Sequence, residues 1–236
     1  MRYHRSGKYY DIALGSEVVH IGGEDDDEPL VVEPLNAAVR DALQHIHNLY
    51  IVNPDSLRLV QQLGLNADTI QFFAVSGSHM PSQAVTWPPE LFPKTLLLPI
   101  DAHEPSAPLK VPSGVRRLVL RIHYVRGSDW DPDALSIDLG NTNQDQKPAE
   151  LVVVCKMRFS PVRSVSSSGG TEGAGRQLDA LISPLLGVAT QLTVVDPPKG
   201  WKVMPGALAM NRDEWERSGD PAEHEWARAD GYHRSD

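Results

Sequence analysis

The chain has 236 residues, of which 22% are charged and 41% are apolar, a composition that is ordinary for a soluble globular protein able to bury its own core. The formal net charge of −9 argues against a general affinity for nucleic acid or an anionic membrane surface. The single cysteine, Cys155, excludes an intramolecular disulfide, and the sequence has neither a secretory signal of the usual kind nor a run of about 18 apolar residues that would span a membrane. A cytoplasmic or nuclear protein is therefore expected.

Residues 1–34 are predicted to form a polar N-terminal arm. Two short apolar segments, Tyr9 to Leu14 and Glu17 to Ile21, flank a Gly-Ser pair and predict a hairpin. The acidic run from Glu24 to Glu28 lacks the spaced Asp-x-Asp-x-Asp-Gly pattern of a calcium loop. Clustered carboxylates repel one another, so a solvated loop is favoured over a metal site.

An α/β repeat-like domain is predicted from residue 35 to residue 200. Apolar residues at three- and four-residue steps indicate helices at 35–46 and 57–63. Short strands are expected at Leu49 to Val52 and at Ile70 to Val75, one on each side of the second helix. A strand, a helix and a strand in this order form a βαβ unit, which implies parallel pairing of the two strands.

The clearest alternation of apolar and polar residues lies in the middle of the chain. Apolar residues occupy every second position in four segments: 95–100, 115–124, 135–139 and 151–155. In the second segment, Leu118 and Leu120 alternate with Arg117, Val119 and Arg121, which predicts a strand with one buried face.

The pairing of these central strands is left open by their spacing. Leu96, Leu118, Leu135 and Leu151 are 22, 17 and 16 residues apart. The longer gap suits a parallel crossover, whereas the shorter gaps also allow an antiparallel meander of the last three strands.

The C-terminal part is expected to begin with a flexible loop over residues 162–175, which are rich in serine and glycine. A helix over 177–186 and a strand over 191–195 follow. Residues 201–236 are predicted to form an acidic tail with a short helix that starts near Asn211. Packing of Trp215 on the core is favoured over a role as a peptide-like anchor.

No metal or cofactor is predicted from the histidines, the glycines or the cysteine. His45 and His47 are two residues apart and point away from each other on a helix, and His79, His103 and His123 add no Cys-x-x-Cys or His-Glu-x-x-His motif. The glycines between residues 169 and 175 lack the preceding strand and the following Lys of a phosphate loop. Cys155 lies at an inward strand position and is interpreted as a small core residue.

A small α/β hydrolase-type enzyme is the alternative function that the residues suggest. Ser76 and Ser78 follow a predicted strand, and a site near Ser76 to His79 would lie at the carboxyl end of that strand. The Gly-x-Ser-x-Gly spacing of a nucleophile turn is absent, and the turn leads into a proline-rich loop instead of a helix.

A cationic strand face is the candidate binding site. If the strands at residues 118 and 151 lie near each other, their outward positions share one surface: Arg117, Arg121, His123, Lys156 and Arg158. Such a surface could receive an acidic peptide or the acidic tail of another subunit. The competing interpretation is that these side chains only keep the strands in solution.

Three segments carry a resemblance to a known class of protein. They are Val115-Arg-Arg-Leu-Val-Leu-Arg-Ile-His-Tyr124, Ala134-Leu-Ser-Ile-Asp-Leu139 and Ala149-Glu-Leu-Val-Val-Val154. The sequence resembles the C-terminal half of uncharacterised fungal proteins of the F-box-like and leucine-rich-repeat-like kind, and no F-box is present. The resemblance implies a mainly parallel, irregular leucine-rich-repeat-like sheet with helices and loops behind it, and adaptor-type protein binding.

A non-catalytic protein-interaction module, an adaptor or a scaffold, is therefore the expected function, and another protein is the expected partner. No small-molecule ligand is inferred, and the sequence leaves open whether the chain is complete or a fragment of a longer protein.

Overall fold

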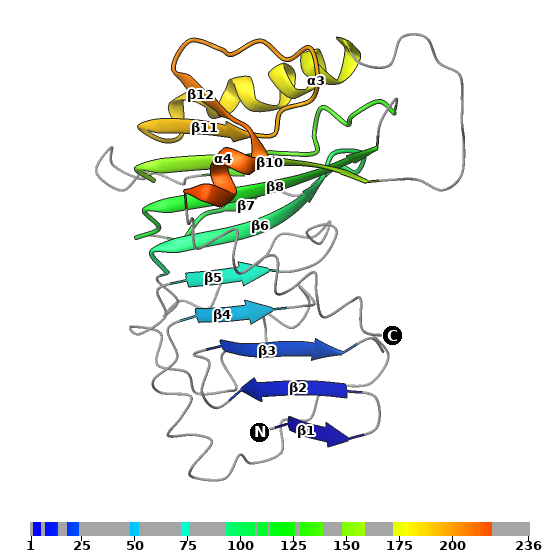
Figure 1. The fold of residues 1–236 in the computed structure, drawn as a ribbon, viewed down its shortest axis with the longest axis vertical. Coiled ribbons are helices and arrows are strands. Elements are labelled where there is room, and N and C mark those ends of the chain that lie inside the picture. Colours follow the sequence, from blue (N-terminus) through cyan, green and yellow to red (C-terminus); the bar gives the residue numbers. More distant parts are fainter. Residues whose placement is uncertain are drawn as a thin grey trace.

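The computed structural model describes residues 2–5, 8–13, 18–23, 48–51, 72–75, 93–106, 108–112, 114–125, 128–138, 148–158 and 172–218. Within these ranges, ten strands form one sheet in which strands that follow each other along the chain also lie side by side (Figure 1). The strands of this sheet are, in order, β1 (Arg2–Arg5), β2 (Lys8–Ala13), β3 (Val18–Gly23), β4 (Asn48–Ile51), β5 (Phe72–Val75), β6 (Thr95–Asp101), β8 (Arg117–Val125), β10 (Glu150–Arg158), β11 (Gln191–Val195) and β12 (Ala207–Met210).

The sheet is mainly parallel, which confirms the predicted α/β class. β2 is antiparallel to both β1 and β3, so the predicted hairpin forms. Every pair from β3 onward is parallel, including β4 with β5, the two strands of the predicted βαβ unit. β1 to β3 lie in the predicted N-terminal arm and β12 lies in the predicted C-terminal tail, but all four belong to the same sheet as the other strands. The domain boundaries at residues 34 and 200 remain predictions.

The open question of the central strands is settled by β8 and β10, which are direct parallel neighbours. The intervening segment leaves the sheet: β9 (Ile137–Asp138) pairs with β7 (Leu109–Lys110) in a separate two-stranded sheet. The segment between β8 and β10, which contains β9, has enough length to cross over so that β10 runs parallel to β8. The expected strand at 135–139 is therefore much shorter than its alternation suggested.

One face of the sheet builds the larger core, and we call it the α3 face. The register aligns aliphatic side chains from neighbouring strands, so that Leu96, Leu118, Leu151 and Leu192 form one row. Helix α3 (Glu172–Ile182) and the short helix η4 (Ser183–Gly187) cover this face with Leu178, Leu181, Ile182 and Leu185. Each fully buried leucine contributes roughly 1.5 to 3 kcal/mol to stability.

Helix α3 begins earlier than the sequence indicates. Residues 172–175 are helical, although they were expected to end a flexible loop. Gly175 explains the close packing of the helix, because a Cβ atom at this position would lie 2.7 Å from the backbone nitrogen of Trp201. The α-helix ends at Ile182, and Pro184 stands at the start of η4, since proline cannot continue an α-helical hydrogen-bond ladder.

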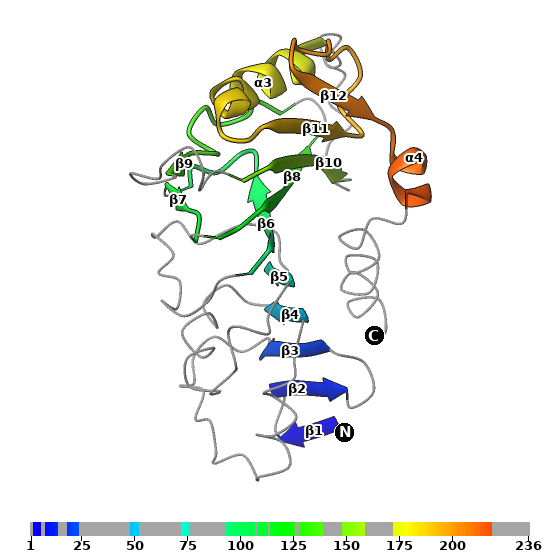
Figure 2. The ribbon, with the colours of Figure 1, turned by 90° about the vertical axis from the view of Figure 1, so that its left-hand side faces the viewer.

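The second face is covered as well, and we call it the α4 face. Helix α4 (Arg212–Arg217) lies on the side of the sheet opposite α3 (Figure 2). Its Trp215 packs on a smaller cluster formed by Leu97, Val119, Val152, Val154 and Val195. The packing prediction for Trp215 is confirmed, and the prediction of a strand with one exposed face is wrong for β8, whose residues from Leu118 to Tyr124 are all buried.

Several predicted features lie outside the described residues. They are the helices at 35–46 and 57–63, the acidic run at 24–28, the Ser76 to His79 turn and most of the 162–175 loop.

Candidate binding face

Polar side chains meet at the carboxyl ends of three adjacent strands on the α4 face. The register places Asp101 of β6 beside His123 of β8, and His123 beside Lys156 of β10. Because the strands are parallel, these residues lie at the same edge of the sheet, where open α/β sheets bind their ligands. The structure therefore brings together His123 and Lys156 of the five predicted residues, and it adds Asp101.

Arg121 lies two residues before His123 on the same strand face. Its neighbours across the sheet are Pro99 and Val154. Arg121 is 4% exposed and His123 is 6% exposed, so both differ from the solvent-facing residues that the alternation predicted. A buried guanidinium is tolerated only with compensating contacts, and both residues make at least one hydrogen-bonding, ionic, ring or other electrostatic contact.

The other two predicted residues are placed differently. Arg117 begins β8, six residues before His123, which is a distance of about 20 Å along a strand. Its Nε atom forms an ion pair of 2.9 Å with Glu150 of the neighbouring strand. The structure therefore does not bring Arg117 to the carboxyl edge. Arg158 ends β10 with its backbone beside Val125, and its side chain lies outside the described part of the structure.

Acidic residues make this edge mixed in charge instead of purely cationic. The Asp101 carboxylate lies beside His123 in register and accepts a hydrogen bond of 3.0 Å from the backbone N–H of His103. Asp196 directly follows β11 and adopts a left-handed backbone with φ of 51°, a conformation that aspartate tolerates better than most residues. Asp101 ends β6 and Asp196 directly follows β11, and both strands show alternation in the sequence. An acidic residue at the end of an alternating segment is the sequence signal that could have identified them.

Cys155 is a core residue, as predicted. It lies on the α3 face beside Ile122 and is 1% exposed. Burial raises the pKa of its thiol far above the ordinary value, and the negative charge of Asp196 raises it further. Because the thiolate is the reactive form of cysteine, this thiol is unsuited to act as a nucleophile.

His103 has a structural role that fixes its protonation pattern. Its Nε2 atom accepts a hydrogen bond of 2.8 Å from the backbone N–H of Val125, so Nε2 carries no proton. Its Nδ1 atom lies 2.8 Å from the carbonyl oxygen of Asp129, which can only accept, so Nδ1 donates. The ring therefore connects the end of β8 to the next loop, and neither nitrogen is available to a substrate.

The other residues considered for catalysis or metal binding are not among the residues that the structure describes. Ser76 to His79, His45 and His47 lie outside the described residues. Within the described ranges, no three His, Cys, Asp or Glu side chains gather closely enough to hold a metal ion.

No helix within the described ranges is long and apolar enough to cross a membrane. Comparisons of the chain with protein-family models, with curated proteins and with solved structures find no match.

Proposed function

We propose that the chain is a non-catalytic protein-interaction module, an adaptor or scaffold, whose α4 face binds a segment of another protein. The strand spacing supports this proposal. β4, β5, β6 and β8 begin at residues 48, 72, 95 and 117, so successive steps are 24, 23 and 22 residues. Steps of roughly 20 to 29 residues are typical of leucine-rich repeats, whose stacked strands offer an extended binding surface. The spacing also supports the resemblance to fungal F-box-like and leucine-rich-repeat-like proteins.

The composition of the α4 face is the observation that carries the proposal. Its centre is apolar, and the five aliphatic side chains of that centre are at most 1% exposed. Its edge is polar and carries Asp101, His123 and the half-buried Lys156. Because Trp215 covers this centre, the polar edge is the part of the α4 face that stays open to a partner. The half-buried Lys156 favours a partner segment that carries acidic side chains.

Two described residues that could serve catalysis are already held by the fold. Both ring nitrogens of His103 bind backbone groups, and the thiol of Cys155 is buried with a raised pKa. Their placement favours binding over catalysis at this edge of the sheet.

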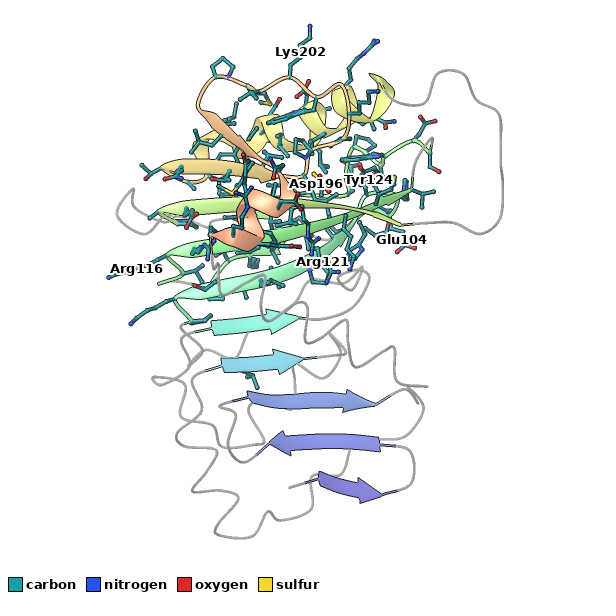
Figure 3. The ribbon with its side chains drawn as sticks, viewed as in Figure 1. Glu104, Arg116, Arg121, Tyr124, Asp196 and Lys202 are labelled. Atoms are coloured by element: carbon teal, nitrogen blue, oxygen red, sulfur yellow. The ribbon has the colours of Figure 1, made fainter. Side chains whose placement is uncertain are left out.

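Affinity purification with a charge-reversal variant tests the proposal. Lys156→Glu places a negative charge at the rim, so we expect the partner to be captured at least tenfold less than by the unchanged chain. Lys202→Glu is the matched control, because Lys202 is exposed on the loop before β12, away from this rim (Figure 3). Equal urea unfolding midpoints for the two variants exclude a loss of folding.

The captured partner is then purified, and its affinity for the three chains is measured directly. A partner that binds Lys156→Glu as tightly as the unchanged chain would show that this rim is not the binding site.

A further inference from the structure

Strand β12 ends the sheet, and among the residues that the structure describes it has a neighbouring strand on one side only (Figure 1). It pairs in parallel with β11, with Leu208 beside Thr193 and Met210 beside Val195. Leu208 is 55% exposed and Ala209 is also exposed, so solvent reaches this edge. An open strand edge presents backbone N–H and C=O groups that can pair with another strand.

The backbone groups that point away from β11 can be assigned from one hydrogen bond. The carbonyl oxygen of Met210 accepts a hydrogen bond of 2.9 Å from the N–H of Asp196, which directly follows β11, so Met210 faces β11. Alternate residues of a strand direct their backbone groups to opposite sides, so Ala207 and Ala209 face the open edge. The N–H of Ala207 already donates to the carbonyl oxygen of Met204 over 3.0 Å. The carbonyl of Ala207 and both backbone groups of Ala209 therefore remain to pair with a further strand.

The side chains of β12 leave this edge unprotected. Natural edge strands are commonly blocked by a charged residue or by proline. β12 consists of Ala207, Leu208, Ala209 and Met210 and contains neither. Leu208 and Val203, which lies on the loop before β12, are the two most exposed large hydrophobic side chains in the described part of the chain, at 55% and 56%. An apolar edge of this kind favours pairing with another chain.

The charges around β12 have opposite signs at its two ends. The loop before the strand carries the exposed Lys199 and Lys202, and the other end lies beside the exposed Asp196 (Figure 3). Helix α4 then places the exposed Asp213 in its first turn, while Arg212 forms an ion pair within the helix. A second copy in the antiparallel orientation brings the basic start of one strand to the acidic end of the other. A parallel second copy would instead bring like charges together.

We propose that β12 is a self-association edge, at which two copies of this chain pair through antiparallel β12 strands. A two-fold axis at Leu208 places this residue opposite its equivalent in the second copy. The N–H of Ala209 in each copy then donates to the carbonyl oxygen of Ala207 in the other, and the two sheets become continuous. This edge is a different surface from the rim with Lys156, so the dimer and the proposed partner do not compete for the same residues.

Disulfide trapping tests the position of the axis. Directly opposite residues of this kind have Cα atoms about 4.5 Å apart, which a disulfide can bridge. We expect the full chain with Leu208→Cys to form a covalent dimer under a mild oxidant at least tenfold faster than the chain with Val203→Cys, a matched control of equal exposure away from the axis. Cys155 is 1% exposed and does not compete for the bond. Equal rates for the two variants would show that β12 does not pair in this way.

Sedimentation equilibrium measures the strength of the association. Leu208→Lys places two like charges at the axis, and Ala209→Pro removes the N–H that bonds across it. We expect each variant to raise the dissociation constant of the dimer at least tenfold. Met157→Lys is the matched control, because Met157 is an exposed apolar residue near the end of β10, away from the edge of the sheet, and it should leave the constant unchanged.

Urea unfolding midpoints show which variants fold, and Leu208→Lys keeps the test valid if the proline variant does not. An unchanged chain that stays monomeric at every concentration overturns the proposal, as does a dimer that the folded Leu208→Lys chain retains.

Discussion

The two faces of the sheet are built by the same strands but are packed in different ways. On the α3 face, aliphatic rows from β6 to β11 meet the apolar side of α3. On the α4 face, a smaller apolar cluster lies beside the buried Arg121 and His123. Burying these polar groups requires compensating contacts that a purely structural face does not need. We therefore interpret the α3 face as the source of stability and the α4 face as the surface for recognition.

Two neighbouring leucines of β6 allow a direct comparison of the two faces. Leu98 points to the α3 face and Leu97 to the α4 face, and both are fully buried. Replacement of a buried leucine by alanine costs about 2 to 5 kcal/mol, depending on how well the surroundings close the cavity. We expect Leu98→Ala to lie near the upper end and Leu97→Ala near the lower end, because the short helix α4 can move into the space. Urea unfolding measures the loss of unfolding free energy for both variants. A larger loss for Leu97→Ala than for Leu98→Ala would contradict this difference between the faces.

Two glycines of α3 show how closely this helix approaches its neighbours. A Cβ atom at Gly175 would meet the backbone of Gly200 and Trp201, so Gly175→Ala should cost about 1 to 3 kcal/mol through overpacking. A Cβ atom at Gly173 would meet nothing within 4 Å, so Gly173→Ala should stabilise the protein by about 0.5 to 1 kcal/mol. Thermal unfolding of the two variants gives the sign of each effect, and a stabilising Gly175→Ala would refute the close approach.

The pH dependence of the unfolding free energy tests whether Cys155 is buried on the α3 face. The folded protein raises the pKa of Cys155 above its ordinary value of 9.0, so above that pH the unfolded chain loses a proton that the folded chain retains. The stability from this group is present below about pH 9 and falls by about 1.4 kcal/mol per pH unit above it. Cys155→Ala should lack this component of the decline. Identical pH profiles of unfolding for the two chains would contradict the burial of the thiol.

The cap of α4 makes a small contribution to stability. Asn211→Ala removes the side-chain acceptor for the backbone N–H of Glu214 and should cost about 1 kcal/mol. Because α4 covers only the α4 face, hydrogen exchange should increase for the amides of α4 and remain unchanged for those of α3. Faster exchange in α3 would mean that the two faces are not independent.

The main strands of the sheet could be predicted because their side chains alternate. The alternation of Leu96, Leu98 and Ile100 identified β6, and β11 begins and ends at the predicted residues. Because β8 and β10 pair in parallel, both strands end at the same edge of the sheet. The two short strands β7 and β9, which lie in the connections between the main strands, were not predictable in this way. Each has only two residues, and their pairing depends on long-range contacts.

The candidate face was predicted only in part, because its burial depends on a distant segment. Alternation placed Arg121, His123 and Lys156 on one side of the sheet, but it carried no information about α4. This helix begins at Arg212, 91 residues after Arg121, and packs on the same face through Trp215. Charge alone also gave no reason to separate Arg117 from Lys156. Their separation follows from the strand length and from the ion pair of Arg117 with Glu150.

Photo-crosslinking from the rim tests the central claim most directly. A photoreactive residue is introduced at position 156, at the carboxyl edge of the α4 face, and at position 116, which is exposed at the opposite end of β8 (Figure 3). We predict that the purified partner crosslinks to position 156 and not to position 116. Crosslinks from position 116, with none from position 156, would contradict the assignment of the α4 face as the recognition surface.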